Sequence, residues 1–373
     1  MIIGIDASRA NKPNKTGTEW YSWHLIEELK KIAPESDSFR LYANSLLIGE
    51  LGILTGVKWQ EKILTWPPKF LWTQIRLWWE LLLNPPDALL VPAHTIPLLP
   101  IRRRIRVLVN VHDVGFKRSP ELYKPIQVWY HDLTMKRIRS RADLIITISE
   151  FSKREIMELY EVPEEKIKVV HLGFDAANYH EQSDSDIAAA MEKYGAADPY
   201  LLYVGRLEKK KNIGNIVKAF VIAREHHENL KLVLAGSSGN QYDEIKEIIS
   251  GLKLEKEIIL PGYVPQKDLP QLIAGAKAFL FPTLYEGFGL PILEAMACGT
   301  PVITSDTPPH TEVGGEAAVY IDPKSPEKLA DAIMKVLEND EFRRQVAESG
   351  VLRAKEFSWR KTAESILAII KNT

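Results

Sequence analysis

Short apolar runs of strand length alternate with longer amphipathic stretches over nearly the whole chain. This alternation predicts parallel strands joined by helical crossovers, and therefore an α/β fold. In the first half, the expected strands are Ile2–Ile5, Ala88–Val91, Val107–Val111, Leu144–Ile148 and Lys168–His171. In the second half, they are Tyr200–Val204, Leu232–Ala235, Ile258–Leu260, Ala278–Phe281, Pro301–Thr304 and Ala318–Ile321.

Two helices of the first half have clear local signals. One is predicted from about Thr18, because apolar residues recur at the spacing of one helical face as far as Ile32. Another is predicted after Ser149, whose hydroxyl can cap the amides of Phe151 and Ser152. Both lie where a crossover between parallel strands is required.

The polar segment Asn178–Gly195 interrupts this pattern, and a second series of strands follows it. We expect residues 1–178 to form one Rossmann-like domain, with a C-terminal helix of about 358–373 packing back on it. Residues 179–357 are expected to form a second such domain. Ligands of doubly wound sheets bind at the carboxyl ends of the strands. Two such sheets facing each other would therefore create one interdomain cleft.

Charge and cysteine content narrow the classes of function. The chain has 373 residues, with 48 Lys and Arg against 49 Asp and Glu, and a formal charge of −1. A chain with almost no net charge does not attract nucleic acid over its whole surface, so any anion must be bound by a local site. The single cysteine, Cys298, excludes an internal disulfide and a cysteine-rich zinc site. It fits a reducing compartment, and a cytoplasmic location is expected.

Two further features bear on location. The chain begins directly with a predicted strand and lacks the pattern of a signal peptide. The uncharged stretch Ala88–Ile101 is too short and too rich in proline to span a bilayer. Neither export nor a transmembrane helix is predicted.

A basic strand-to-helix turn follows the strand that ends at Val204. Gly205, Arg206 and the lysines up to Lys211 lead into a helix, which places cations and free helix amides where a diphosphate could lie. The alternative is a solvated basic loop.

The segment Phe281–Pro301 gives a stronger signal. Gly287 and Gly289 allow close backbone approach, and Pro291 suits the first turn of a helix that ends at Gly299. The free amides at this helix start would face the same edge of the sheet as the basic turn. The sequence therefore predicts an anion site assembled from two separate segments.

Two carboxylates accompany this site. Glu286 precedes the helix, and we expect Glu294 in its first turn. A carboxylate beside an anion site is unfavourable unless it accepts hydrogen bonds from hydroxyls, and sugar and ribose hydroxyls are such donors. The alternative is that Glu294 only stabilises the helix start and that Glu286 is a loop charge.

With these motifs, the chain resembles a known family, the retaining glycosyltransferases of family 4, which have the GT-B fold. The likeness covers nearly the whole chain, and its most specific part is the motif from Glu286 to Glu294. The other matching segments are Pro92–His94, Val111–Val114, Ser119–Glu121, Ala142–Ser152, Tyr203–Asn212, Pro261–Val264, Phe281–Pro301 and Thr311–Val313.

The resemblance implies roles for particular residues of the second domain. Arg206 and Lys211 would hold the donor diphosphate and stabilise its charge as it leaves. Glu286 would bind hydroxyls of the transferred sugar, and Glu294 would accept from the ribose. The backbone at Tyr263 and Val264 would contact the nucleobase. The whole implied donor-binding set of this domain is Gly205, Arg206, Lys211, Tyr263, Val264, Glu286, Gly287, Phe288, Gly289, Leu290 and Glu294.

From the first domain, Gly17 would approach the diphosphate, and His112 would lie beside the sugar undergoing transfer. The chain departs from the family pattern at two places. Lys15-Thr16-Gly17-Thr18 stands where relatives often have paired glycines, and Pro309-His310-Thr311 precedes Glu312 where Leu-Pro is common. Neither departure changes the charged groups.

The resemblance implies transfer of a hexose from a nucleotide diphosphate sugar to a hydroxyl of a glycan or lipid-linked acceptor, with retention and without a metal or other cofactor. GDP-mannose is the first candidate donor, and UDP-glucose or a related UDP-sugar is the second. A nucleotide-sugar-binding scaffold, a hydrolase and an epimerase of the same fold remain alternatives. The intact set of Arg206, Lys211, Glu286 and Glu294 argues against a scaffold. The oligomeric state is not readable from the sequence.

Other motifs are weaker. Asp184-Ser185-Asp186 resembles a metal motif of a different glycosyltransferase fold but follows no apolar strand. His112 could serve as a general base or a zinc ligand, yet no second His or Cys stands at ligand spacing. Gly236-Ser237-Ser238-Gly239 lacks the spacing of a nucleophile elbow, and Gly287-Phe288-Gly289 lacks the third glycine of a dinucleotide fingerprint.

The segment Trp66–Leu83 is rich in tryptophan, and Arg102–Arg104 follow it. Aromatic and arginine side chains suit a membrane interface, which would place the protein at the inner face of the membrane. The stretch around Trp72–Leu83 is apolar on most faces, however, and this favours burial in the first domain. Peripheral membrane contact is kept as the alternative.

Overall fold

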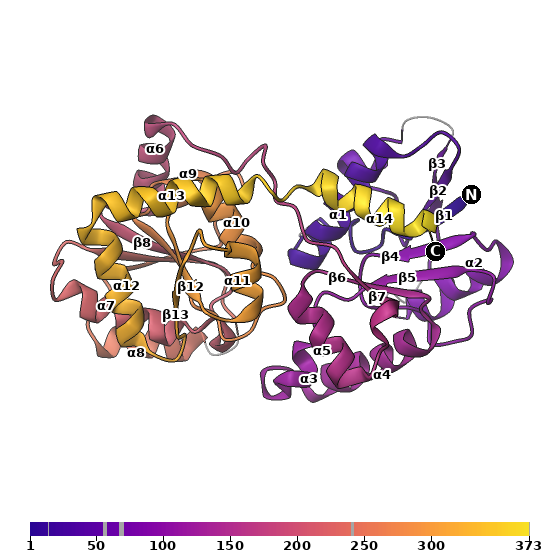
Figure 1. Cartoon of the computed structure of the whole chain (residues 1–373), viewed down its shortest axis with the longest axis horizontal. Coiled ribbons are helices and arrows are strands. Elements are labelled where there is room, and N and C mark those ends of the chain that lie inside the picture. Colours follow the sequence, from indigo (N-terminus) through magenta and orange to yellow (C-terminus); the bar gives the residue numbers. More distant parts are fainter. Residues whose placement is uncertain (14, 55–57, 67–70, 240–241, 373) are drawn as a thin grey trace. The chain divides into compact units, whose positions relative to one another are not determined.

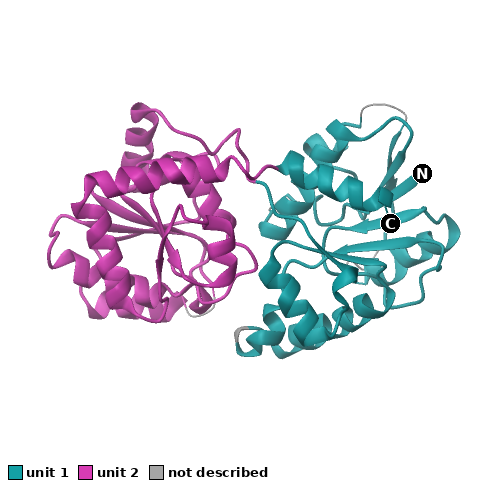
Figure 2. Ribbon diagram, viewed as in Figure 1, with its two compact units in different colours: residues 1–173, 359–373 teal, residues 174–358 magenta. Residues whose placement is uncertain are grey.

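The computed structural model describes residues 1–13, 15–54, 58–66, 71–239 and 242–372. The chain forms two compact units, which Figure 2 colours separately. Unit 1 comprises Met1–Gly173 and Trp359–Thr373, and unit 2 comprises Phe174–Ser358. Each unit is a parallel sheet with helices, so the predicted α/β class of two Rossmann-like halves is confirmed.

The sheet of unit 1 has the strand order β3-β2-β1-β4-β5-β6-β7, and every neighbouring pair is parallel (Figure 1). Its strands are β1 (Ile2–Asp6), β2 (Ser38–Ala43), β3 (Trp59–Ile63), β4 (Ala88–Val91), β5 (Arg106–Asn110), β6 (Leu144–Thr147) and β7 (Ile167–Val169). Its α-helices are α1 (Gly17–Ile32), α2 (Trp78–Leu83), α3 (Gly115–Arg118), α4 (Pro125–Arg141), α5 (Glu150–Tyr160) and α14 (Trp359–Asn372). The π-helical turn η2 (Trp72–Leu77) leads into α2.

The sheet of unit 2 has the order β10-β9-β8-β11-β12-β13 and is also parallel throughout. Its strands are β8 (Tyr200–Val204), β9 (Lys231–Ala235), β10 (Ile258–Gly262), β11 (Ala278–Phe281), β12 (Val302–Ser305) and β13 (Val319–Ile321). Its α-helices are α6 (Asp184–Tyr194), α7 (Ile213–Arg224), α8 (Tyr242–Gly251), α9 (Leu269–Ala274), α10 (Leu290–Ala297), α11 (Pro308–Gly314), α12 (Pro326–Glu338) and α13 (Asp340–Ala354).

The predicted strands are present, but two strands of unit 1 were missed. β2 and β3 lie between Ile5 and Ala88, where the sequence predicted only a helix. β3 is the outermost strand of its sheet, and Gln60 and Glu61 are exposed. An edge strand that is half exposed needs no continuous apolar run, so the hydrophobic pattern does not reveal it.

The local helix signals are confirmed. α1 and α5 begin where they were predicted, and the Ser149 hydroxyl accepts a hydrogen bond from the Ser152 amide at 3.0 Å. The polar segment 178–195 contains α6, a helix that was not predicted. Asp184 and Asp186 belong to its first turn, where Ser183 caps the Asp186 amide at 3.2 Å.

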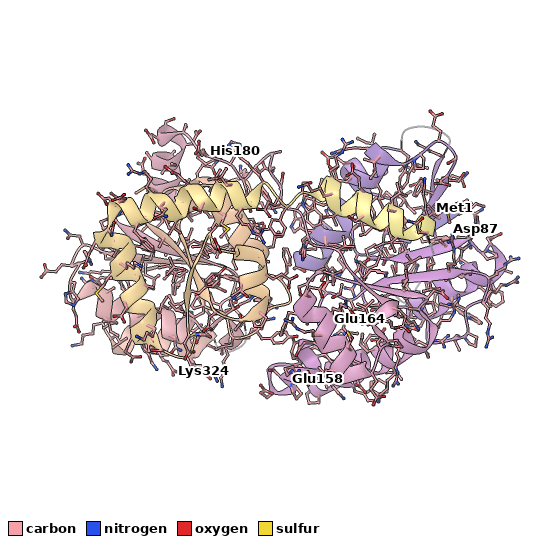
Figure 3. The ribbon with its side chains drawn as sticks, in the orientation of Figure 1. Met1, Asp87, Glu158, Glu164, His180 and Lys324 are labelled. Carbon is pink, nitrogen blue, oxygen red and sulfur yellow. The ribbon has the colours of Figure 1, made fainter. Side chains whose placement is uncertain are left out.

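Both ends of the chain are fixed in unit 1. Asp87 accepts a hydrogen bond from the Ile2 amide at 2.6 Å, and Figure 3 labels Met1 and Asp87 side by side at the start of β1. At the other end, α14 packs on α1, where the Trp359 and His24 rings stack with centroids 4.9 Å apart. Within the described residues, no helix is both long and apolar enough to cross a bilayer.

Each sheet has one point where the strand order reverses. In unit 2 this point lies between β8 and β11, which are neighbours in the sheet but not in the chain. The connections after these two strands leave toward opposite sides, which opens a crevice at their carboxyl ends. In unit 1 the corresponding point lies between β1 and β4. The topology therefore directs the functional site to the loops after these strands.

Candidate functional site

The loop after β8 depends on two glycines. Gly205 has a φ of 149°, and an added Cβ would lie 2.6 Å from the Tyr203 hydroxyl. Gly236, which follows β9 with a φ of 158°, approaches so closely that its added Cβ would lie 1.8 Å from the Gly205 carbonyl oxygen. A side chain at Gly236 would collide with the backbone of Gly205, and one at Gly205 would collide with the Tyr203 hydroxyl. The glycine pair thus fixes the turn that presents Arg206.

The loops after β8 and β11 are joined by several hydrogen bonds, which the sequence did not predict. The Leu284 amide donates to the Lys210 carbonyl at 2.9 Å. The buried Asn212 side chain, in the left-handed region at φ 62°, donates to the Pro282 carbonyl at 2.9 Å. Lys211 and Glu286 form an ion pair and a hydrogen bond. Asn212 was not recognised from the sequence, although an asparagine is a common non-glycine residue in the left-handed region.

The cations of this site differ in how they are held. Lys211 is largely buried and neutralised by Glu286. Arg206 is exposed, and its side chain has no hydrogen bond or ion pair with the described residues. An anion bound here would meet Arg206, which has no partner among the described residues, and would share Lys211 with the Glu286 carboxylate.

Glu286 is kept ionised by its neighbours. Burial raises the pKa of its carboxyl, but the Lys211 and Lys210 ammonium groups outweigh burial and hold the pKa below its usual range. A partly buried carboxylate that is ionised has accepting positions left over after one ion pair. It can therefore bind hydroxyl groups beside the cations.

The helix after β11 begins with a tight turn. Gly289 caps α10 with a φ of 107°, Pro291 follows in the first turn, and Gly299 ends the element with a φ of 74°. These features agree with the sequence prediction. Glu294 was expected in the first turn of α10, but α10 begins at Leu290, and Glu294, its fifth residue, lies just past that turn. Glu294 therefore cannot be explained as a carboxylate that stabilises the first turn.

Glu294 is the most perturbed carboxyl of the site. Its side chain accepts no hydrogen bond from the described residues. Burial, with a smaller contribution from Asp175, raises the pKa of Glu294 to about 8. Burial of a carboxyl without hydrogen bonds is costly, and a strongly raised pKa marks Glu294 as a candidate binding group for hydroxyl donors.

The remaining donor-site candidates of unit 2 follow the neighbouring strands. Tyr263 and Val264 come directly after β10, where Gly262 has a φ of 75°. The Tyr263 side chain is 74% exposed, whereas Val264 is buried. The exposed ring stands at the same sheet edge as the loops after β8 and β11, because all these strands are parallel.

Gly17 and His112 belong to unit 1. Gly17 is the first residue of α1, and His112 follows β5. The His112 Nε2 lies 3.1 Å from the Pro92 carbonyl, which can only accept, so Nε2 carries the proton and Nδ1 has the free lone pair. Burial lowers the pKa of His112 and favours this neutral form. The interdomain cleft that would join these residues to unit 2 stays a prediction.

Two further histidines lie near His112 and were not selected from the sequence. The His94 and His131 rings have centroids 4.9 Å apart, and burial lowers the pKa of His94 to about 3. The buried His131 Nδ1 has no hydrogen-bond partner among the described residues. His94 follows β4, one of the two strands at the reversal point of unit 1, and this position is the signal that could have identified it.

Within the described ranges, no group of three or more His, Cys, Asp or Glu side chains has the geometry of a metal site. Among the described residues, Arg206, Lys211 and the start of α10 are positive features that could attract an anion.

Comparison with known proteins gives matches in sequence and in fold. The model of Glycosyltransferase Family 4 matches residues 17–178, and that of Glycosyl transferases group 1 matches residues 186–353. The O-antigen chain mannosyltransferase B of Escherichia coli is 34% identical over 266 residues, which cover 70% of each chain. The O-antigen chain mannosyltransferase RfbU of Salmonella typhimurium is 29% identical over 243 residues, covering 65% of this chain and 63% of that protein.

The crystal structure of Anabaena HepE in complex with UDP-glucose superposes with a TM-score of 0.76 at 19% identity and covers 100% of this chain and 99% of that one. The fold and the family matches together define the class of the protein, a glycosyltransferase with the GT-B fold. The chain belongs to glycosyltransferase family 4, and it is a retaining enzyme.

Proposed function

We propose that the enzyme transfers mannose from GDP-mannose to a hydroxyl of a glycan or lipid-linked acceptor in polysaccharide assembly. The observation that carries this proposal is the Lys211–Glu286 pair in the loops after β8 and β11, together with Arg206 of the first loop, whose exposed side chain has no partner among the described residues. It combines cations for a diphosphate with a carboxylate for sugar hydroxyls. Mannose is favoured because the two relatives above are called O-antigen chain mannosyltransferases. UDP-glucose is the second candidate, as the ligand named for HepE.

In this proposal each group of unit 2 has one task. Arg206 and Lys211 bind the diphosphate together with the amides at the start of α10, from Gly287 to Leu290. Glu286 accepts hydrogen bonds from the transferred sugar. Glu294 accepts from the ribose hydroxyls, and the segment at Tyr263 and Val264 contacts the base.

Catalysis follows from where charge develops. As the bond between sugar and diphosphate breaks, negative charge grows on the leaving group, and the attraction of Arg206 and Lys211 for it grows in step. No carboxylate is assigned as a nucleophile. The acceptor attacks from the face that the diphosphate leaves, and a diphosphate oxygen takes the acceptor proton. No metal is needed in this scheme, because the cations and the α10 start supply the positive charge.

Donor and reaction type are tested by one assay. GDP-mannose and UDP-glucose are incubated with the enzyme and a panel of glycan and lipid-linked acceptors, with and without EDTA, and products are identified by mass spectrometry and NMR. Transfer of mannose with retention, unaffected by EDTA, supports the proposal. Transfer only from UDP-glucose overturns the donor, and release of free sugar as the sole product identifies a hydrolase.

Gly17 gives a prediction about the contribution of unit 1. An added Cβ would have no described heavy atom within 4 Å, so the fold leaves room for alanine. If the Gly17 backbone approaches the diphosphate, Gly17→Ala should lower kcat/KM by about tenfold. It should not lower the Tm, because alanine is the better helix former. Unchanged kinetics would remove Gly17 from the donor site.

We further propose that unit 1 contacts an anionic membrane through the exposed face of η2 and α2. Trp72, Leu77 and Leu81 are buried there, so the expected burial of this segment is correct for one face only. Residues 67–70 lie outside the described residues. The other face exposes apolar side chains four residues apart, at 48%, 36%, 53% and 60% for Leu71, Ile75, Trp79 and Leu83.

Basic residues lie near this apolar face. The Trp78 Nε1 donates to the Pro100 carbonyl at 2.9 Å, and the exposed side chains of Arg102, Arg103 and Arg104 follow Pro100 closely in the chain. Glu80 on the same helix is largely buried and pairs with Arg76 at 3.4 Å. Apolar and tryptophan side chains with nearby arginines match the chemistry of an anionic lipid surface.

Liposome flotation tests this contact. Wild type should float with vesicles containing phosphatidylglycerol and much less with phosphatidylcholine alone. The double variant Trp79→Ser/Leu83→Ser should bind several-fold less, and so should the variant with Arg102–Arg104 changed to Ser. Leu352→Ser, which removes an exposed leucine of unit 2, is the control and should bind like wild type. Equal flotation of all variants, or none by wild type, would end the membrane proposal.

A further inference from the structure

His310 is a buried polar residue that packs against the loop carrying Glu286. It lies on α11 with 0% exposure, and its ring packs tilted against Phe281 with centroids 5.6 Å apart. Both ring nitrogens have partners. Nε2 lies 3.2 Å from the Thr283 hydroxyl, and Nδ1 lies 3.2 Å from the hydroxyls of Thr304 and Thr307.

The hydrogen bonds define the state of this ring. The Thr304 hydroxyl donates its one proton to the Phe281 carbonyl at 2.9 Å, so it can only accept from His310. The proton of the imidazole is therefore on Nδ1, and Nε2 accepts from the Thr283 hydroxyl. Burial lowers the pKa of His310 to about 4, which agrees with a neutral ring.

The ring contacts both ends of the loop that carries Glu286. Thr283 is near the start of this loop, and its carbonyl accepts from the Ser305 hydroxyl at 2.7 Å. At the other end, an added Cβ on Gly289 would lie 3.2 Å from the His310 Cδ2. The absence of a side chain at Gly289 thus makes room for the imidazole. Thr283, Gly289 and His310 form one packed unit beneath Glu286.

We infer that His310 is a positioning residue for donor transfer, acting through Thr283 and Gly289 to fix the position of Glu286, which accepts from the transferred sugar. This inference rests on the proposed function, in which this loop binds the transferred sugar. It goes beyond the roles assigned above, because His310 is buried behind the loop and does not itself touch the donor.

The experiment compares variants that remove one contact at a time. His310→Leu keeps apolar bulk and removes both nitrogens, and Thr283→Val removes only the hydroxyl that reaches Nε2. His310→Gln can still present an acceptor toward Thr283, whereas His310→Asn is too short for this and can only replace Nδ1. Thr300→Val is the matched control, since the buried Thr300 hydroxyl donates to the Ile273 carbonyl at 2.8 Å, away from the loop.

The expected result is a specific loss in the handling of the sugar. His310→Leu, His310→Asn and Thr283→Val should each lower kcat/KM for the donor by about tenfold, and His310→Gln should recover most of it. His310→Leu and Thr283→Val should not be additive, because they break the same connection. GDP, which lacks the sugar, should bind all variants as it binds wild type, and Thr300→Val should behave as wild type in every assay.

Two results would overturn the inference. One is a donor kcat/KM in His310→Leu and Thr283→Val equal to that of wild type. The other is a fall in Tm accompanied by the same fold-loss of affinity for GDP and for the donor, which would indicate a merely structural role. Failure of the proposed function is distinguished by wild type itself, which would then give no glycosyl transfer in the same assay. Calorimetric binding of GDP-mannose against GDP still reports on His310 in that case.

Discussion

Arg206→Ala and Lys211→Ala are expected to lower turnover by about 100-fold or more, the usual cost of removing a preorganised charge from a site where negative charge develops. The two variants should differ in stability. Arg206 is exposed and its side chain has no partner among the described residues, so its loss should leave the Tm unchanged. Lys211 neutralises a partly buried carboxylate, so its loss should lower the Tm as well.

The measurement is steady-state turnover with saturating donor, together with thermal unfolding. Lys209→Ala is the matched control, because Lys209 belongs to the same short turn and its exposed side chain has no hydrogen bond or ion pair with the described residues. It should keep the activity of wild type. If Arg206→Ala turned over at the rate of Lys209→Ala, Arg206 would have no part in stabilising the leaving group.

The Lys211 variant also predicts a change in pH dependence. In wild type, Lys211 is the main group that holds the pKa of Glu286 below its usual range. Without Lys211, burial should dominate and raise that pKa. The residual activity of Lys211→Ala should therefore fall on the acidic side at a higher pH than that of wild type. An unchanged acidic limb would show that Glu286 is not required in its ionised form.

The position of the donor-site residues could be predicted because it follows from strand order. Arg206 follows β8 and Glu286 follows β11, and both strands are marked by continuous apolar runs. Once these runs are recognised as parallel strands, their carboxyl ends must lie at one sheet edge. The ion pair between Lys211 and Glu286 could not be derived, since it depends on the conformations of two loops.

The interaction of His310 with Thr283 could not be predicted from the sequence for a related reason. It depends on the register that sets Phe281 opposite Thr304 and brings α11 beneath the loop. The exposed face of α2 was hidden for a different reason. Nearly every position from Trp72 to Leu83 is apolar, so the hydrophobic pattern cannot distinguish the face that packs on unit 1 from the face that does not.

Glu294→Gln is expected to stabilise the protein in mildly alkaline solution and to weaken nucleotide binding. The pKa of Glu294 is raised by burial to about 8, from an ordinary value of 4.5 in the unfolded chain. When the pKa of a carboxyl is higher in the folded than in the unfolded protein, its contribution to the free energy of unfolding is fully present below the unfolded pKa. This contribution is lost as the pH rises toward the folded pKa. Each pKa unit corresponds to about 1.4 kcal/mol. The glutamine variant does not titrate and should therefore have the higher Tm at pH 8, but not at pH 4.

Nucleotide binding should show the opposite effect. Ribose hydroxyls that donate to an ionised Glu294 lower its pKa in the complex, so binding releases a proton below pH 8. The affinity for GDP should then rise with pH, by at most about tenfold per unit, and level off near the pKa of the empty site. Calorimetry in buffers of different ionisation enthalpy counts the released proton directly.

Glu294→Gln should bind GDP more weakly than wild type at pH 8, without this pH dependence and without proton release. A variant that gained stability and kept its affinity would make Glu294 a destabilising residue with no role in binding. The expected result is higher stability together with lower affinity. It would show that Glu294 destabilises the ligand-free protein, because an unpartnered buried carboxyl opposes folding, and that the same residue contributes to ligand binding.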